Sequence, residues 1–175
     1  MGGKTMNHIV LYAPEIPQNT GNIMRTCVAT NAKLHLIKPL GFSLDTKHLK
    51  RSAANYLEHL EYYVYESFED FLSKNEGLYY FLTRYGEKSP DQFDFSSSNE
   101  EIYLIFGSES SGMPKELLKQ HLNRCMRLPM TDKVRSLNLS NTVAILLYEV
   151  LRQQGYPNLM SHEPEIYKGK DYLKK

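Results

Sequence analysis

Three loop segments concentrate the residue types that bind ligands or do chemistry. They are 14–25 (PEIPQNTGNIMR), here called the first loop, 107–114 (GSESSGMP), the glycine loop, and 128–141 (LPMTDKVRSLNLSN), the third loop. Each is richer in Gly, Pro, Asn and Ser than a turn needs, and we expect each to lie at the end of a strand. Ligands bind beyond the carboxyl ends of the strands in open α/β sheets, so the three loops are predicted to form one site.

The glycine loop fits several ligand-binding patterns only in part. Gly107 and Gly112 have the spacing of a phosphate-binding P-loop, but Met-Pro follows where that loop needs Lys-Ser or Lys-Thr. Glu109 replaces the second glycine of a dinucleotide-binding fingerprint, and Ser110 only half matches the nucleophile elbow of a hydrolase. A nucleoside triphosphate, a nicotinamide cofactor and serine hydrolysis are therefore disfavoured. A plain glycine turn between a strand and a helix explains this loop as well as a ligand site does.

Arg25 is the residue of the first loop that suits an anion. It lies about a turn and a half beyond Asn19 on a predicted helix, whose N-terminus already favours negative groups. A guanidinium in this place suits an RNA phosphate. The common alternatives are a solvated helix face or a surface ion pair for Arg25, and a simple turn for residues 14–20.

The third loop places hydroxyl and amide side chains directly before a long apolar helix. Ser136, Asn138, Ser140 and Asn141 crowd this stretch, and capping of the helix explains one or two of them. The remainder, close to Met130, favour hydrogen bonding to a ligand with donor and acceptor edges, such as adenosine.

The overall composition limits the classes of protein and partner. The chain has 175 residues, 41% of them hydrophobic, which is enough for the core of one domain. Its 21 basic and 20 acidic residues nearly cancel, so any nucleic-acid contact must depend on a local patch. Six scattered histidines and two cysteines show no metal-ligand spacing, and we expect no metal. No secretion signal or membrane-spanning run occurs, so we expect a cytoplasmic protein with no membrane partner.

Short apolar runs alternate with helical patterns along the chain. The runs are rich in branched and aromatic residues, which predicts an α/β fold with a mostly parallel sheet and helices on both faces. A single domain of residues 1–175 is expected, with a core of about 7–157, a loosely held tail of 158–175 and no role for residues 1–5. The predicted strands are 8–12, 34–37, 78–82 and 102–106.

Apolar residues at helical spacing predict four helices. They cover 20–31, a short segment capped by Ser67, the segment from Pro114 through His121, and a long segment that ends near Gly155. Either Asn138 or Ser140 is expected to cap the last of these helices. The polar segment 89–100 is predicted to be a surface loop.

Taken together, the three loops resemble the three motifs of the SPOUT superfamily of RNA methyltransferases. The matching stretches are PEIPQNTGNIMRTC, FGSESSGMP and LPMTDKVRSLNLSNTVAILLYE, which occur in the family's order over about residues 7–157. The chain looks most similar to the small bacterial enzymes that methylate the 2′-hydroxyl of the wobble cytidine or uridine in leucine tRNAs. Those enzymes lack an added RNA-binding domain, and we expect none here.

The resemblance implies a fold, a cofactor and partners. It implies a deep C-terminal trefoil knot, S-adenosylmethionine bound inside that knot, and a homodimer that acts on a tRNA anticodon stem-loop. The knot depends on the family alone, because true knots are almost absent from proteins. Two alternatives stay open: a SPOUT methyltransferase that acts on ribosomal RNA, and a non-catalytic RNA-binding factor with the same fold.

The resemblance also assigns roles to individual residues. Arg25 would be catalytic, but a guanidinium is a poor general base. We therefore expect Arg25 to orient the ribose hydroxyl and an adjacent phosphate and to favour the alkoxide. The other catalytic residues that the resemblance implies are Asn19, Asn138 and Ser140. The cofactor-binding residues that it implies are Leu82, Gly107, Glu109, Leu128, Met130, Ser136 and Leu137.

Overall fold

A computed structural model describes residues 6–45, 56–96 and 99–174. Residues 1–5 lie outside the described residues, as do positions 97 and 98 of the expected surface loop and Lys175 at the end of the tail. Within the described part, no helix is both long enough and apolar enough to span a membrane.

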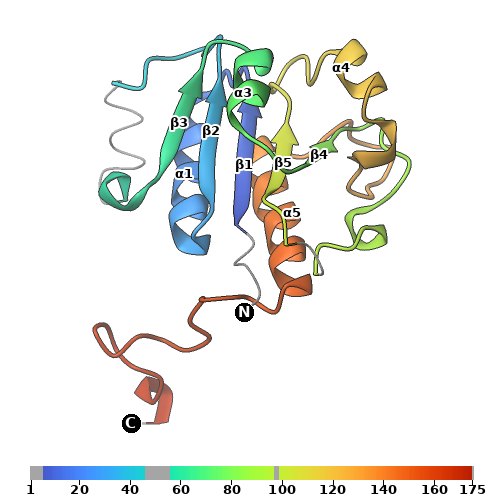
Figure 1. The fold of residues 1–175 in the computed structure, drawn as a ribbon. Helices are drawn as coiled ribbons and strands as arrows, with labels where there is room; N and C mark the ends of the chain where they lie inside the picture. Colours follow the sequence, from blue (N-terminus) through green and yellow to red (C-terminus); the bar gives the residue numbers. More distant parts are fainter. Residues whose placement is uncertain (1–5, 46–55, 97–98, 175) are drawn as a thin grey trace.

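A six-stranded sheet lies at the centre of the protein, with the strand order β3-β2-β1-β5-β4-β6 (Figure 1). Every pairing among the described strands is parallel, which confirms the predicted α/β class. The strand order reverses at β1, because β2 and β5 flank it on opposite sides. Ligands bind at the carboxyl ends of strands beside such a reversal. The strands are β1 (Asn7–Tyr12), β2 (Lys33–Ile37), β3 (Tyr62–Tyr65), β4 (Leu78–Leu82), β5 (Ile102–Phe106) and β6 (Cys125–Met126).

Two of these strands were not predicted from the sequence. β3 lies at the edge of the sheet, and its residues Tyr62, Tyr63 and Val64 are exposed. β6 consists of Cys125 and Met126, too few residues to show a periodic pattern. β6 therefore depends on its pairing with β4, whereas β3 was missed although strands favour its residue types.

The described residues form four helices and four short 3-10 turns. α1 begins at Pro17, three residues before the predicted start, because proline suits the first turn of a helix. α4 ends at Lys119, so the prediction that it continues through His121 was wrong; a separate 3-10 turn follows. The helices are α1 (Pro17–Thr30), α3 (Phe68–Lys74), α4 (Lys115–Lys119) and α5 (Leu139–Gln153), and the 3-10 turns are η1 (Leu57–His59), η2 (Pro90–Gln92), η3 (Leu122–Arg124) and η4 (Tyr172–Lys174).

The ends of the helices agree with the capping residues expected from the sequence. The Ser67 hydroxyl accepts a hydrogen bond from the Asp70 backbone N–H at 3.1 Å and caps α3. Asn138 caps α5 in the same way. α5 ends just before Gly155, whose φ of 74° is the left-handed conformation that glycine commonly adopts after a helix.

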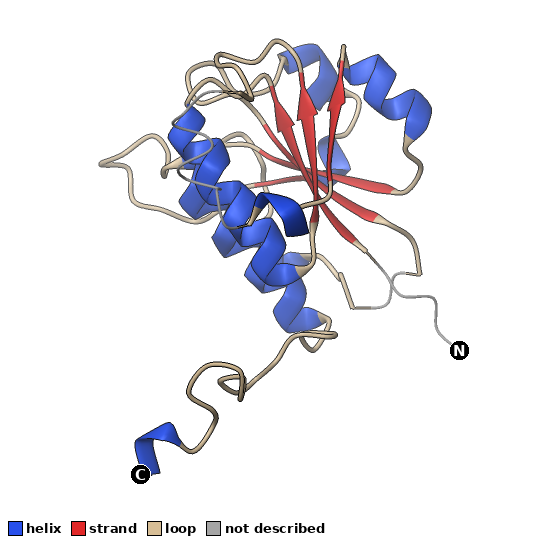
Figure 2. Ribbon diagram, turned by 90° about the vertical axis from the view of Figure 1, so that its left-hand side faces the viewer, coloured by secondary structure: helices blue, strands red, loops and turns tan. Residues whose placement is uncertain are grey.

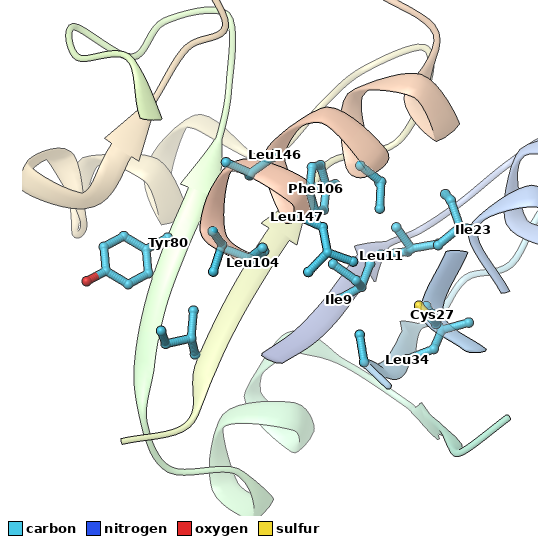
Figure 3. Packing of buried hydrophobic residues seen from close by; sticks show 14 of the residues in the cluster. Ile9, Leu11, Ile23, Cys27, Leu34, Tyr80, Leu104, Phe106, Leu146 and Leu147 are labelled. Atoms are coloured by element: carbon cyan, nitrogen blue, oxygen red, sulfur yellow. The ribbon is translucent and has the colours of Figure 1, made fainter. Parts of the chain in front are cut away.

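Helices cover both faces of the sheet (Figure 2). α1 and α5 pack on one face, where Ile9 and Leu104 of the strands meet Leu147 of α5 (Figure 3). α3 and α4 cover the other face with Phe71 and Leu118. Successive strand residues point to opposite faces, so strands that are covered on both sides are apolar throughout.

The segment 89–100 is more than the surface loop that its polarity predicted. Phe95 is 1% exposed, and its ring packs edge-on against Tyr80 with 4.9 Å between ring centres. Its backbone N–H donates to the Gln153 side chain of α5 at 3.0 Å. Phe93 also packs against Tyr80 and Phe95, so two aromatic residues anchor this otherwise polar segment to the core.

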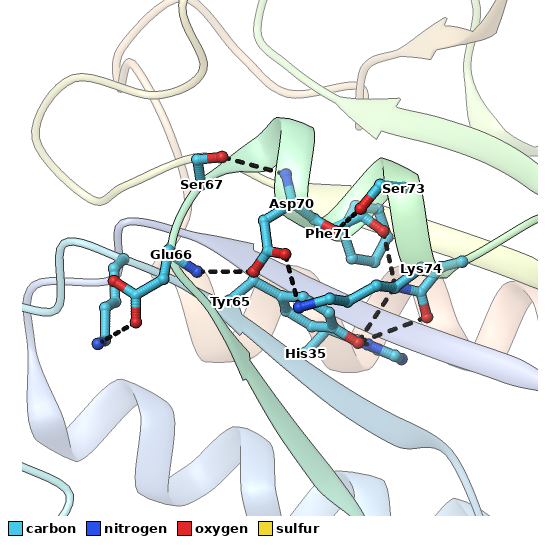
Figure 4. A network of polar contacts seen from close by, with 10 residues as sticks. His35, Tyr65, Glu66, Ser67, Asp70, Phe71, Ser73 and Lys74 are labelled. Atoms are coloured by element: carbon cyan, nitrogen blue, oxygen red, sulfur yellow. Dashed lines mark hydrogen bonds and ion pairs between the residues drawn. The ribbon is translucent and has the colours of Figure 1, made fainter.

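A chain of buried hydrogen bonds lies on the sheet face that α3 covers. His35 is 1% exposed and lies between His8 and the Tyr65 hydroxyl, at 2.8 Å from each. Figure 4 shows the contact between His35 and Tyr65. His8 in turn lies 2.5 Å from a carboxylate oxygen of Glu101. Burial, and then the neighbouring His8, lower the pKa of His35 to about 3.

His35 is expected to make the protein less stable in acid. Because its folded pKa lies below the unfolded value of about 6.5, the fold favours the neutral ring. This contribution to the free energy of unfolding is complete above about pH 6.5 and is lost as the pH falls toward about 3. Urea unfolding across this range should show the loss, and His35→Gln should show a shallower one. Equal pH slopes in the two proteins would contradict the assignment.

Candidate active site

One cavity lies beyond the carboxyl ends of β4 and β5. It has a volume of about 590 Å³ and is lined by the glycine loop, the third loop, the segment after β4 and the start of α1. The structure thus brings the three loops together around one space. Nine of the eleven residues that the sequence singled out line it: Asn19, Leu82, Gly107, Glu109, Leu128, Met130, Ser136, Leu137 and Asn138.

Arg25 and Ser140 are the two singled-out residues that do not line the cavity. Arg25 is exposed on α1, and its guanidinium carbon lies 5.1 Å from the centre of the Tyr56 ring. The Ser140 hydroxyl donates to the Asn138 side-chain oxygen at 2.6 Å, so Ser140 can reach the cavity only through Asn138. Tyr56 was not predicted as a neighbour of Arg25, because the two are far apart along the chain.

Glu109 of the glycine loop holds the start of α1 in place. One carboxylate oxygen accepts the Glu15 backbone N–H at 2.8 Å, and the other accepts the Ile16 backbone N–H at 3.1 Å. The second oxygen also accepts the Asn19 side-chain amide at 3.2 Å. A carboxylate here satisfies N–H groups at a helix N-terminus and interacts favourably with the helix dipole. Glu109 therefore positions Asn19, while a direct contact with a cofactor stays a prediction.

Asn138 joins α5 to α1. Its side-chain oxygen accepts the backbone N–H groups of Ser140 at 2.9 Å and of Asn141 at 3.3 Å. Its amide nitrogen donates to the side-chain oxygen of Asn19 at 3.0 Å, and Asn19 is 6% exposed. A continuous hydrogen-bonded chain therefore runs from Glu109 through Asn19 to the third loop and fixes the three loops relative to one another.

The glycine loop turns so tightly that Gly107 admits no side chain. A Cβ at this position would lie 2.2 Å from the Gly112 carbonyl carbon and 2.4 Å from the Met113 nitrogen. Gly112 has a φ of 68°, and its N–H donates to the Ser108 carbonyl at 2.9 Å to close the turn. Gly107 is thus required by a close backbone approach and Gly112 by a left-handed conformation.

The segment after β4 belongs to the site, although the sequence pointed only to Leu82 in this region. The Thr83 backbone N–H donates to the carbonyl of Met126 in β6 at 2.9 Å, and the Arg127 guanidinium donates to the Arg84 carbonyl at 2.8 Å. Arg84, Arg127 and Arg135 all line the cavity, which gives it positive charge suited to an anionic group. Arg84 could have been predicted as a site residue, because it follows the end of the predicted strand 78–82.

The sequence matches one protein family over most of its length. The match is to the family described as SpoU rRNA Methylase and covers residues 6–148. The chain belongs to the SpoU rRNA methylase family. All three loops fall inside the matched range, and membership confirms the RNA methyltransferase class that the motifs indicated. The trefoil knot stays a prediction.

Relatives of this SpoU methylase are similar in sequence and in fold. A Geobacillus stearothermophilus protein, provisionally named tRNA (cytidine(34)-2′-O)-methyltransferase, is 52% identical over 153 residues, which are 87% of this chain and 98% of the relative. A solved structure of a provisionally assigned RNA methyltransferase from Bacillus anthracis is 54% identical, with a TM-score of 0.83 over 87% of this chain and 97% of that one. Another solved structure, which concerns the 2-OH methylation of C/U34 on tRNA, is 40% identical, with a TM-score of 0.80 over 86% and 97%.

Substitutions of Asn138 in this SpoU methylase are expected to separate its role as the cap of α5 from its hydrogen bond to Asn19. Asn138→Ala removes the cap of α5 and should cost about 1 kcal/mol of unfolding free energy, a fall in Tm of roughly 2–4 °C. Asn138→Ser keeps a capping oxygen but is too short to reach Asn19, so we expect nearly unchanged stability and weaker cofactor binding. Thermal unfolding and calorimetric titration with S-adenosylmethionine measure the two effects. Unchanged cofactor affinity in the serine variant would limit Asn138 to capping.

Proposed function

We propose that the protein transfers a methyl group from S-adenosylmethionine to the ribose 2′-hydroxyl of the wobble nucleotide, cytidine or uridine 34, in tRNA. The observation that carries the proposal is the single cavity around which the three motif loops meet. The relatives concerned with position 34, at 52% and 40% identity, support the choice of nucleotide. From the motif resemblance, leucine tRNAs are the expected substrates, bound through the anticodon stem-loop.

The cavity has a size and a lining that suit S-adenosylmethionine. Its volume of about 590 Å³ lies within the range of roughly 300–1,000 Å³ that is usual for small-molecule sites. Leu82, Leu128 and Met130 offer apolar surface for the adenine ring, and Ser136 offers a hydroxyl for its polar edge or for the ribose. When bound, S-adenosylmethionine supplies a methyl group on a positively charged sulfur, which an oxygen nucleophile attacks in line. The reaction as proposed involves no metal ion.

Arg25 is proposed to act on the RNA. It lies six residues beyond Asn19, about 9 Å along the helix axis, and side chains on a helix tilt toward its N-terminus. Its exposed guanidinium can therefore meet an RNA strand that reaches the cavity from this side. There it would bind a phosphate, orient the ribose hydroxyl and stabilise the alkoxide as it forms.

The proton of the ribose hydroxyl is proposed to leave through a phosphate oxygen or water. Among the described residues that line the cavity, none is a histidine, and Glu109 already accepts three hydrogen bonds. A guanidinium is too weak a base to take the proton itself. Arg25 would therefore lower the barrier by charge and orientation rather than by proton transfer.

We further propose a cytoplasmic homodimer with one SPOUT domain per chain, whose core spans about residues 7–157. Three large apolar or aromatic side chains near the cavity and on α5 support a protein partner of this kind: Ile16 is 43% exposed, Ile145 47% and Tyr148 46%. Ile145 and Tyr148 lie on α5, and Ile16 lies directly before α1; these two helices cover the same face of the sheet. A second copy of the chain would cover this surface.

Methylation of total RNA tests the function. The purified protein is incubated with labelled S-adenosylmethionine and tRNA from cells that lack the activity, and with ribosomal RNA in parallel, because the family description names that substrate. Nuclease digestion and mass spectrometry then locate the methyl group. A 2′-O-methyl group at position 34 of tRNA is expected. Label in ribosomal RNA alone would replace the proposed substrate, and cofactor binding without any methylation would indicate a non-catalytic RNA-binding protein.

A further inference from the structure

The positive charge of the chain is concentrated at its C-terminal end. The last ten residues, 166–175 (IYKGKDYLKK), contain four lysines and one aspartate, whereas the other 165 residues contain 17 basic and 19 acidic residues. The segment also contains two tyrosines. Lysine combined with aromatic residues is the pattern of surfaces that hold the backbone and the bases of single-stranded or looped RNA.

The tail, residues 158–175, leaves the domain after Leu159, which still packs against the core, and its described residues beyond that point project away from the rest of the protein (Figures 1 and 2). Ile166, Tyr167 and Leu173 are 85%, 72% and 93% exposed. Exposing large apolar and aromatic side chains to water is unfavourable, and such exposure is typical of a segment that binds a partner.

The end of the tail is folded on its own. The Tyr167 and Gly169 backbone N–H groups both donate to the Pro164 carbonyl, at 3.0 Å and 3.2 Å, and Tyr172 N–H donates to Gly169 at 3.2 Å. Gly169 has the left-handed φ of 73° that this turn requires. Within the described residues, the backbone hydrogen bonds donated by 164–174 stay inside the tail. The turn is therefore held by backbone hydrogen bonds within the tail and not by backbone hydrogen bonds to the domain.

The lysines of the tail are placed for anionic and aromatic partners. Lys168 lies with its ammonium 4.5 Å from the centre of the Tyr172 ring, and Lys174 pairs with Asp171 at 2.9 Å. Lys170 is exposed and has no carboxylate within ion-pair distance among the described residues. An ammonium beside a tyrosine ring can bind a phosphate while a base stacks on the same ring or on Tyr167.

We propose that the tail is an RNA-binding arm that holds the tRNA substrate away from the methyl-transfer cavity. This rests on the proposed function for the identity of the RNA. α5 has 15 residues and is about 22 Å long, and it separates Asn138 at the cavity from the start of the tail. The arm therefore contacts a part of the RNA other than the target nucleotide. It contributes affinity for tRNA and leaves the cofactor site untouched.

Charge favours RNA over a second copy of this chain as the partner of the tail. A second copy presents a nearly neutral surface, whereas RNA presents one phosphate per nucleotide. The relative from Geobacillus stearothermophilus is matched over 98% of its own length by 153 residues, so the shared catalytic domain does not need all 175. An added positive arm is thus compatible with an unchanged active site.

Binding of tRNA to the full-length protein, without cofactor and at several salt concentrations, tests the arm. The variant Lys168→Gln with Lys170→Gln is compared with a matched control, Lys115→Gln with Lys119→Gln, which removes two exposed lysines from α4. For the tail variant we expect the Kd for tRNA to rise roughly tenfold, the slope of log Kd against log salt to fall by about 1.5, and the affinity for S-adenosylmethionine to stay unchanged. Tyr167→Ser with Tyr172→Ser should also weaken binding but keep the salt slope.

The proposed RNA-binding arm would be contradicted if the tail lysine variant bound tRNA as tightly as the unchanged protein, or if the α4 control lost as much affinity as the tail variant. A change in self-association of the tail variant with unchanged tRNA affinity would instead assign the tail to contact with a second copy of the chain. The test is separate from that of the proposed function, because it measures binding and not methylation. If the tail binds tRNA but only ribosomal RNA is methylated, the proposed substrate is wrong and the RNA-binding role of the tail remains supported.

Discussion

Arg25→Ala is expected to lower kcat for tRNA methylation at least about a hundredfold while the affinity for S-adenosylmethionine stays unchanged. The guanidinium of Arg25 lies outside the cavity and beside Tyr56, so its removal takes away the group that we propose to contact RNA and leaves the cavity lining intact. Without it, the ribose hydroxyl loses the charge that orients it and stabilises the alkoxide. Single-turnover methylation and calorimetric titration with the cofactor measure the two quantities.

Two variants control the Arg25 experiment. Arg25→Lys keeps the charge but loses the planar fork, so an intermediate kcat is expected. Arg152→Ala removes another exposed arginine from a helix, one that pairs with Glu149 at 2.8 Å, and should leave kcat normal. A normal kcat in Arg25→Ala would contradict the catalytic role assigned to Arg25. A large loss of cofactor affinity in that variant would instead place Arg25 at the cofactor.

Gly107→Ala is expected to weaken S-adenosylmethionine binding by at least about tenfold, or 1.4 kcal/mol, and to reduce methylation with it. The new Cβ would lie 2.2 Å from the Gly112 carbonyl carbon, so the glycine loop would have to open. Both glycines line the cavity, and an opened loop would displace the backbone groups expected to bind the cofactor. Calorimetric titration of the purified variant measures the loss.

Gly155→Ala is the matched control for Gly107→Ala. Gly155 has a φ of 74°, with nothing near its Cβ position within 4 Å, and it lies at the far end of α5 from the cavity. The substitution should cost about 1 kcal/mol of stability through backbone strain and leave cofactor affinity normal. A similar loss of affinity in both variants would show that general destabilisation, rather than the glycine loop, explains the effect.

The buried part of the sheet could be predicted because its strands are apolar on both faces. Every residue of β5, Ile102–Phe106, is buried, and that run is visible in the sequence without any partner. β3 and β6 could not be predicted in this way, because one is an exposed edge and the other has two residues. The segment that contains Phe95 was misjudged for a related reason: most of its residues are polar, and Phe95 is buried by contacts with Tyr80, Phe93 and α5 that form only in the folded chain.

The candidate site could be predicted as a set of loops but not as an arrangement. Composition indicated that the first loop, the glycine loop and the third loop bind a ligand, and the structure gathers them around one cavity. Composition did not indicate that Glu109 binds the start of α1, or that Arg84 and Arg127 line the same space. It also did not show that Arg25 lies outside the cavity.

The sequence by itself determined the apolar strands, the helix caps and the three ligand-binding loops, because periodicity, capping and turn composition act over a few neighbouring residues. The tertiary structure decided which of those residues meet. Asn19, Glu109 and Asn138 are far apart in the chain. They share hydrogen bonds only because β1, β5 and β6, from which their loops emerge, belong to one parallel sheet in which β4 joins β5 to β6. That alignment is a property of the whole sheet, and no local pattern encodes it.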